Sequence, residues 1–111
     1  MVTPQQVQRG FCQYIDNDIL TKVNGWQRWV VGAAAAAFAD NLPSKLTELR
    51  NNPAVGALGF FDGQGNIDID KLHRYFGEQA SKGPISIPVP LLGPVTLDRS
   101  DVDRLAQYIK E

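Results

Sequence analysis

The first part of the chain carries apolar residues at the spacing of an amphipathic helix. Every fourth position is apolar in the series Val7, Phe11, Ile15, Ile19 and Val23. This spacing places the apolar side chains on one helical face. Thr3, followed by a proline and by a glutamine at the third helical position, is typical of a helix start, and Asn24-Gly25 is typical of a helix end. We therefore predict an amphipathic helix between Thr3 and Asn24.

The next segment is apolar on all sides. From Trp29 to Ala39 no side chain is polar or charged, and a helix of that kind is normally buried on most of its surface. We predict a central helix that ends near Asn41, because the residue before Pro43 disfavours a helical conformation. A separate short helix is then expected to begin at Ser44. As a helix the apolar run is about 16 Å long, about half of a bilayer core, so we predict no membrane span.

Shorter units follow residue 59. A glycine-rich loop over residues 62–66 precedes a helix that we expect to open at Asp68 and to end at Gly83. Aliphatic residues alternate with serine and proline from Ile85 to Val89, and a second arm follows a turn near Gly93. This pattern is typical of a β-hairpin. The prolines cannot donate to a ladder, which predicts an edge strand for the first arm.

The last segment has the signature of a further helix. Ser100, with an acidic residue at Asp103 three positions later, predicts its start. The fold class predicted is mainly α: a single domain of about five helices with a small β-hairpin near the C-terminus. We expect its helical half over residues 3–58 and its loop–helix–hairpin–helix half over residues 59–111.

Two of the predicted helix starts resemble each other. The order Asp, branched aliphatic, Asp, basic, Leu occurs at residues 68–72 and again at residues 101–105. One explanation is convergence, because carboxylates near a helix N-terminus interact favourably with the helix dipole. The other explanation is a duplicated loop–helix unit. Both give these carboxylates a structural task, which argues against catalysis by them.

Composition excludes several function classes. The 111 residues include 11 basic and 12 acidic ones, for a formal net charge of -1. This balance of charges supplies no positive electrostatic field for nonspecific binding to nucleic acid, so we predict no nucleic-acid partner. The single cysteine, Cys12, excludes an intrachain disulfide and a cysteine-rich zinc site, and the single histidine, His73, excludes a multi-histidine metal centre. No cofactor is predicted.

Three acidic residues are candidates for a metal site. Asp62, Asp68 and Asp70 lie in and after the glycine-rich loop, which is similar to part of an EF-hand loop. In that alignment Phe60 takes the first ligand position and Lys71 the twelfth, so the two main carboxylates of a calcium loop are missing. The alternatives are a weak ion site with backbone carbonyls, a small hydrolase built on the same carboxylates, and a plain turn before an Asp-capped helix.

No catalytic residues are predicted. Cys12 adjoins the apolar face of the first helix, where we expect a buried thiol. Its spacing from His73 does not suggest a nucleophile–base pair, which also needs a third, orienting group. The serines fall at predicted caps, helix ends or the hairpin, and none lies at a strand-to-helix elbow.

Two segments are candidates for a partner surface. Trp26 and Trp29 flank Arg28 at the start of the alanine-rich helix, and three roles are open to the indoles: core packing, binding of a protein, or contact with lipid headgroups. The hairpin arm either blocks edge-to-edge pairing through its prolines or packs on a neighbouring subunit. Its candidate contact residues are Ile87, Val89, Leu91 and Leu92.

Short motifs resemble those of a known group of proteins. They are GWQRW at 25–29, KGP at 82–84, LLGP at 91–94 and SDVD at 100–103, followed by Leu105 and Tyr108-Ile109. In these motifs the chain resembles small, functionally uncharacterised proteins encoded in prophages and phage-like elements of Gram-positive bacteria, the Firmicutes in particular. The resemblance runs from the first helix to the C-terminus and carries no catalytic residues. It implies a phage-related context, in a virion or in assembly.

These patterns favour a non-enzymatic structural or interaction protein that self-associates or docks a protein partner. A degenerate EF-hand-like ion-binding module is the first alternative, and a small hydrolase is the second. The N-terminus has neither the basic start nor the apolar run of a secretory signal. The expected location is therefore the cytoplasm, and the resemblance adds association with a virion.

Overall fold

The computed structural model describes residues 1–89 and 93–111, with side chains described outside residues 87–95. Its α-helices are α1 (Pro4–Tyr14), α2 (Trp26–Asn51), α3 (Pro53–Gly56), α4 (Ile69–Lys82) and α5 (Arg99–Lys110). A π-helical turn, η1 (Ile15–Ile19), and a 3-10 turn, η2 (Leu20–Lys22), follow α1. The strands β1 (Ile85–Val89) and β2 (Gly93–Leu97) pair antiparallel. The predicted fold class, mainly α with a hairpin near the C-terminus, is confirmed.

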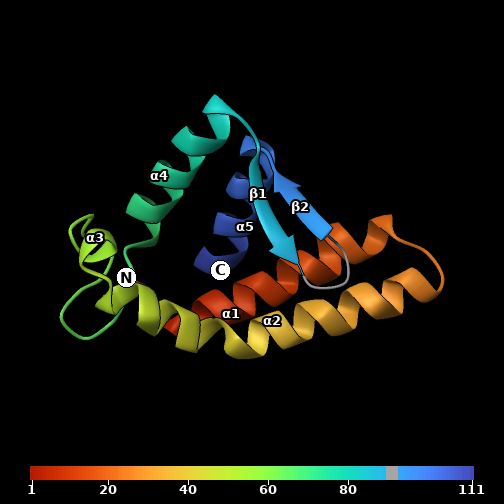
Figure 1. Cartoon of the computed structure of the whole chain (residues 1–111), viewed down its shortest axis with the longest axis horizontal. Helices are drawn as coiled ribbons and strands as arrows, with labels where there is room; N and C mark the ends of the chain where they lie inside the picture. The colour runs from red at the N-terminus through yellow and green to blue at the C-terminus, as the bar shows by residue number, and fades with distance from the viewer. Residues whose placement is uncertain (90–92) are drawn as a thin grey trace.

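The helices are arranged around α1. In Figure 1, α1 and α2 run in opposite directions along one edge of the molecule, and α4, the hairpin and α5 lie on the other side of α1. α1 packs against both α2 and α5, and α4 packs against α5. The end of the molecule at the right of the view consists of η1, η2 and the first turns of α2, which project beyond the other elements.

The start of α1 is the one that the sequence predicts. The Thr3 hydroxyl accepts a hydrogen bond from the Gln6 backbone N–H at 3.1 Å, and the Gln6 side chain accepts one from the Thr3 N–H at 2.7 Å. This reciprocal pair is a capping box. The α-helix ends at Tyr14, and the chain reaches Lys22 through the π-helical and 3-10 turns. The predicted single helix up to Asn24 is therefore wrong in its second half.

The π-helical turn is tied to α5 by a polar network. Asp18 in this turn lies 3.2 Å from Nε of Arg104 and accepts a hydrogen bond from the Tyr108 hydroxyl at 3.3 Å. Arg104 also pairs with Asp101 at 3.1 Å. The wider turn thus brings a carboxylate from the first segment against the last helix, a contact that helical periodicity did not predict.

α2 continues through Pro43, so the predicted end near Asn41 and the separate helix from Ser44 are wrong. A proline lacks the N–H that would bond the carbonyl four residues earlier, which here belongs to Ala39. Gln8 on α1 supplies the missing donor, because its Nε2 lies 2.8 Å from the Ala39 carbonyl oxygen. A contact between helices therefore satisfies the acceptor that the proline leaves open.

α2 is not a central helix, contrary to the prediction. Its neighbours are α1, η1, η2 and α3, and its outer side is exposed along much of its length. α5 packs on α1 and α4 packs on α5, so in the described chain these helices do not cover the apolar run of α2. Its buried residues lie along one face: Val31, Ala35, Ala39 and Leu46. No helix in the described part of the chain is both long enough and apolar enough to cross a membrane.

The caps of α4 and α5 bear on the sequence pattern that residues 68–72 and 101–105 share. Asp68 caps α4 as predicted, accepting from the Lys71 N–H at 3.1 Å. α5 is capped by Asp98, which exchanges hydrogen bonds with Asp101 at 2.9 and 3.1 Å, so the predicted start at Ser100 is wrong. The matching residues Asp68 and Asp101 therefore hold different positions, the cap in α4 and the third helical residue in α5. This difference favours convergence on helix starts over a superposable duplication.

The hairpin strands pair antiparallel in a defined register. Ile85 pairs with Leu97, and Pro88 lies opposite Pro94. Because a proline has no backbone N–H, this pair contributes no donor to the ladder. The hairpin ends beside the last helix, where Leu97 is buried against α5 and α4 residues.

The core draws on both ends of the chain. One buried cluster combines residues from the segments 3–58 and 59–111, together with Val2: Val7, Leu46, Ile67, Ile69 and Ile109. Val2 and Ile67 also exchange backbone hydrogen bonds at 2.8 and 2.7 Å, an isolated bridge that the sequence did not predict. The N-terminal residues are thereby attached to the loop before α4.

Gly10 lies where α1 crosses α5. A Cβ atom at this position would stand 2.5 to 2.7 Å from side-chain and backbone atoms of Ile109. A glycine inside a helix costs about 1 kcal/mol relative to alanine. Here the crossing requires it, because the Ile109 backbone leaves no room for a methyl group.

Candidate interaction surface

Two exposed tryptophans lie in the first turn of α2. Trp26 is 74% exposed and Trp29 is 77% exposed, and the chain has no other tryptophan. Core packing of these indoles, one of the three roles considered from the sequence, is therefore wrong. Arg28 between them is exposed as well. The structure thus places all three predicted partner residues of this segment on the surface.

These indoles belong to a continuous exposed side of α2. Helical geometry brings residues spaced by three, four or seven positions to the same side. Exposed apolar residues at this spacing form what we term the tryptophan face: Trp26, Trp29, Ala33, Ala36 and Ala37. The face lies opposite the residues that α2 buries. The alanines on it were missed from the sequence, although their spacing from the tryptophans was a signal for them.

A largely apolar groove borders the tryptophan face. One hollow of about 510 Å³ lies between η2 and the start of α2, where Leu20, Trp29 and Gly32 line it. A second hollow of about 140 Å³ lies between α1 and α2, and Leu20 and Gly32 line it too. The two hollows therefore adjoin each other at Leu20 and Gly32, and together they form the groove.

Cys12 lines the second hollow and is exposed, so the prediction of a buried thiol is wrong. Partial loss of hydration, together with the carboxylates of Asp16 and Asp40, raises the pKa of this thiol. Because the thiolate is the nucleophilic form of cysteine, these surroundings disfavour nucleophilic chemistry at Cys12.

The structure describes only some of the hairpin residues that were predicted to bind a partner. Ile87 and Val89 lie in β1, where their backbones pair with Val95 and Gly93. Leu91 and Leu92 lie outside the described residues. The backbone register is all that bears on this predicted partner segment.

Asp62 organises its own loop. Its carboxylate accepts hydrogen bonds from the backbone N–H groups of Asn66 at 2.9 Å and Gln64 at 2.8 Å. These bonds, the one from Asn66 first, lower the pKa of the Asp62 carboxyl. The side chain thus closes a turn, as the plain-turn interpretation expects.

The other two candidate metal ligands have separate tasks. Asp68 caps α4, and Asp70 pairs with Nζ of Lys110 at 3.1 Å, which lowers the pKa of the Asp70 carboxyl. Within residues 1–89 and 93–111, no group of three or more His, Cys, Asp or Glu side chains is placed to hold a metal ion. The structure therefore does not bring Asp62, Asp68 and Asp70 together as one site.

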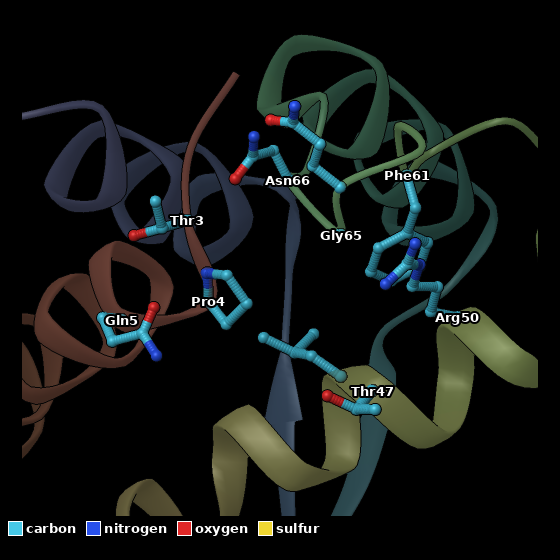
Figure 2. A pocket seen from close by; sticks show the side chains of 10 residues that line it. Thr3, Pro4, Gln5, Thr47, Arg50, Phe61, Gly65 and Asn66 are labelled. Atoms are coloured by element: carbon cyan, nitrogen blue, oxygen red, sulfur yellow. The ribbon is translucent and has the colours of Figure 1, made fainter.

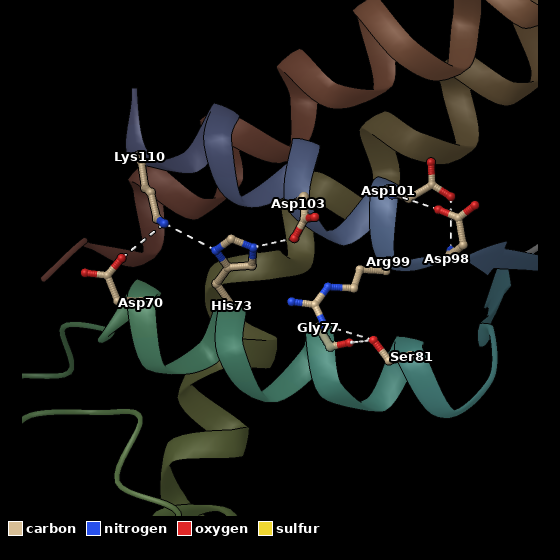
Figure 3. A network of polar contacts seen from close by, with 9 residues as sticks. All are labelled: Asp70, His73, Gly77, Ser81, Asp98, Arg99, Asp101, Asp103 and Lys110. Carbon is tan, nitrogen blue, oxygen red and sulfur yellow. Dashed lines mark hydrogen bonds and ion pairs between the residues drawn. The ribbon is translucent and has the colours of Figure 1, made fainter.

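His73 joins α4 to α5 in a row of polar side chains, shown in Figure 3. Its Nε2 lies 2.7 Å from Asp103 Oδ1, and its Nδ1 lies 3.3 Å from Nζ of Lys110, which also reaches Asp70. Nε2–H donating to Asp103 and Nδ1 accepting from Lys110 is the arrangement consistent with both contacts. Neither hydrogen-bond partner of the imidazole in the described chain carries a hydroxyl or thiol. The row therefore links the two helices α4 and α5.

A polar hollow of about 300 Å³ opens between the start of α1, the end of α2 and the 60–66 loop (Figure 2). Arg50 lines it and donates from Nη2 to the Gly63 carbonyl at 2.7 Å. Gly65, with φ +85°, has the Arg50 Nη1 only 3.0 Å from where a Cβ would stand. The guanidinium therefore holds the glycine-rich loop against α2.

An apolar cavity of about 180 Å³ lies between α4, α5 and the hairpin. Its lining residues include Leu72, Phe76, Leu97 and Val102, together with His73. Phe76 is 39% exposed at this place. Cavities of about this size admit small apolar molecules, and the surface that lines this one is apolar.

Comparisons with protein-family models, with curated proteins and with solved structures gave no match to this chain.

Proposed function

We propose that this chain is a non-enzymatic interaction protein whose tryptophan face binds another protein chain, either a second copy or a different partner. The observation that carries the proposal is the exposure of Trp26 and Trp29, at 74% and 77%, beside an apolar groove. Contiguous exposed apolar surface marks interaction sites, and tryptophan is enriched among the residues that dominate binding energy.

The position of the face supports the same proposal. The first turns of α2 project together with η1 and η2 beyond the rest of the molecule (Figure 1), so a partner reaches them without displacing another element. Gly25, with φ +66°, turns the chain into α2 immediately before the indoles. Burying an indole removes about 150 to 250 Å² of its surface from water, which gives two neighbouring indoles a large share of a small interface.

The non-enzymatic part of the proposal is supported by the tasks of the reactive groups. The candidate carboxylates close a turn, cap a helix or pair with a lysine, and His73 connects two helices. The phage-related setting rests on the resemblance of the short motifs alone, and the cytoplasm or a virion is the location that goes with it. Flanking genes for tail or capsid proteins would support this setting.

Substitution of both indoles tests the proposed function. Trp26→Ala/Trp29→Ala removes the apolar bulk of the face, and Leu58→Ala, at a residue that is 43% exposed on another part of the surface, is the matched control. We expect the wild type and the control to associate, either with themselves in sedimentation experiments or with a co-purifying phage or host protein. The double variant should lose that association. Identical behaviour of all three proteins, with far-UV circular dichroism unchanged, would remove the proposal.

A further inference from the structure

We infer that the occupant of the tryptophan face is a second copy of this chain, bound antiparallel across a two-fold axis near Ala33; the inference rests on the proposed function. The face is uneven along α2. Its N-terminal end carries the two indoles, and its other end carries only the methyl groups of Ala36 and Ala37. A surface that is bulky at one end and flat at the other is complementary to itself when one copy is turned end to end.

The spacing of the residues fixes the register. Trp29 is four residues before Ala33, and Ala37 is four residues after it. A two-fold axis at Ala33 therefore places Trp29 of each copy over Ala37 of the other. Interface cores pack as densely as protein interiors, and a two-fold interface uses one patch twice. In a parallel pair indoles would meet indoles, which would hold the alanines apart.

Charge and hydrogen-bonding capacity agree with this orientation. Asp40 is seven residues after Ala33, and Trp26 is seven before it. The same axis therefore places the exposed carboxylate of Asp40 opposite an indole N–H, which is a donor only. The Asp40 carboxylate also lies beside the N-terminal end of the other α2, which carries a partial positive charge. In a parallel pair Asp40 would face Asp40, which is unfavourable for two carboxylates.

The four indoles supply part of the area that a specific dimer needs. Four indoles, two from each copy, would bury about 600 Å² at the lower figure of about 150 Å² each. A standard interface buries about 1,600 Å² in total. The alanines, Leu20 and the groove beside Gly32 supply further apolar surface on each copy.

Association is measured by sedimentation equilibrium and by intrinsic fluorescence. Both tryptophans lie on the face, so emission should shift to shorter wavelength as protein concentration rises and the indoles leave water. Trp26→Ala/Trp29→Ala should raise the dimer dissociation constant by about 30-fold or more, whereas Leu58→Ala should leave it unchanged. A dimer of equal strength in all three proteins would overturn the inference.

Disulfide trapping tests the orientation. In a Cys12→Ser background, Ala33→Cys lies near the proposed axis and should form a covalent dimer under mild oxidation. Ser44→Cys should not, because its two copies would be about 30 Å apart in the antiparallel pair, at 1.5 Å per residue. Cross-linking of Ser44→Cys to itself would show a parallel pair and overturn the inference.

The two proposals fail in different ways. The wild-type protein could stay monomeric at every attainable concentration and yet capture another protein only when the indoles are present. That result would contradict the inferred dimer but would still support the proposed function. A monomer that captures nothing through the indoles removes both.

Discussion

The side-chain amide of Gln8 donates a hydrogen bond to the carbonyl oxygen of Ala39 at 2.8 Å. Ala39 is four residues before Pro43 and is 2% exposed, so its carbonyl has neither a helical N–H nor bulk water as a partner. A single side chain from α1 therefore makes a proline compatible with the interior of α2. The same bond fixes α1 and α2 to each other.

We expect Gln8→Ala to lower the free energy of unfolding by about 1 to 3 kcal/mol, the cost of leaving a buried acceptor unpaired. Urea unfolding followed by circular dichroism measures this change. The control is the same substitution in a Pro43→Ala background, where the introduced alanine would supply the helical N–H and the loss of Gln8 should cost clearly less. Equal costs in the two backgrounds would show that the bond does not compensate for the proline.

Two glycines inside helices should respond to alanine in opposite directions. Gly10→Ala places a methyl group 2.5 Å from Ile109 atoms, so we expect a loss of stability of at least about 1 to 3 kcal/mol from overpacking. Gly32→Ala meets its nearest atom, Leu20 Cδ1, at 3.9 Å, so it should gain about 1 kcal/mol through helix propensity. Parallel melts at the same low protein concentration compare the two, and a gain at Gly10 would contradict the close crossing of α1 and α5.

The observed cap of α5 can be separated from the one that the sequence suggests. Asp98→Ala removes the side chain that accepts from the Asp101 N–H at 2.9 Å, and we expect a loss of about 1 kcal/mol, as for other N-caps. Ser100→Ala, inside the helix, should change stability little. If the serine substitution proved the more costly of the two, the helix would start where the sequence pattern places it.

Stability should fall as the pH is lowered into the carboxyl range. Burial opposes ionisation of Asp101, but hydrogen bonds from the Asp98 N–H and from Arg104 outweigh it, so the pKa of the Asp101 carboxyl lies below its ordinary 3.8. The pKa values of Asp62 and Asp70 are also lowered. A carboxyl whose pKa is lower in the folded state stabilises the fold above its unfolded pKa and loses this effect as the pH falls through the folded value.

The measurement is a series of urea melts from neutral pH down to below the ordinary carboxyl pKa. We expect a steady loss of stability once the pH falls below about 4. Asp101→Asn should reduce that slope, because one of the groups that binds a proton on unfolding is gone. A slope that is unaffected by this substitution would show that Asp101 does not contribute to the acid sensitivity.

The parts of the fold that were predicted correctly depend on neighbouring residues. Thr3 with Gln6 starts α1, and Asp68 starts α4, because a cap is formed by side chains within one turn of the backbone they bond. The hairpin follows likewise from alternation and turn residues over residues 85–97. The start of α5 shows the limit of this reasoning: Ser100 was predicted, whereas the structure has Asp98 as the cap, and both residue types are good caps.

The candidate surface was predicted in part. Trp26, Arg28 and Trp29 stood out as residue types, but their exposure does not follow from an apolar sequence, because the same pattern is typical of a buried helix. The groove needs Leu20 from η2 beside Gly32 from α2, and no local pattern connects these two.

The sequence alone determined the helical class, the hairpin and the N-terminal caps of α1 and α4, since these depend on interactions over a few residues. Only the tertiary structure decided which helix lies at the centre, because burial depends on how much of the remaining chain packs on each side. It placed α1 there and left the start of α2 exposed. Gln8 at Ala39 and Val2 at Ile67 likewise became partners only through packing of distant segments.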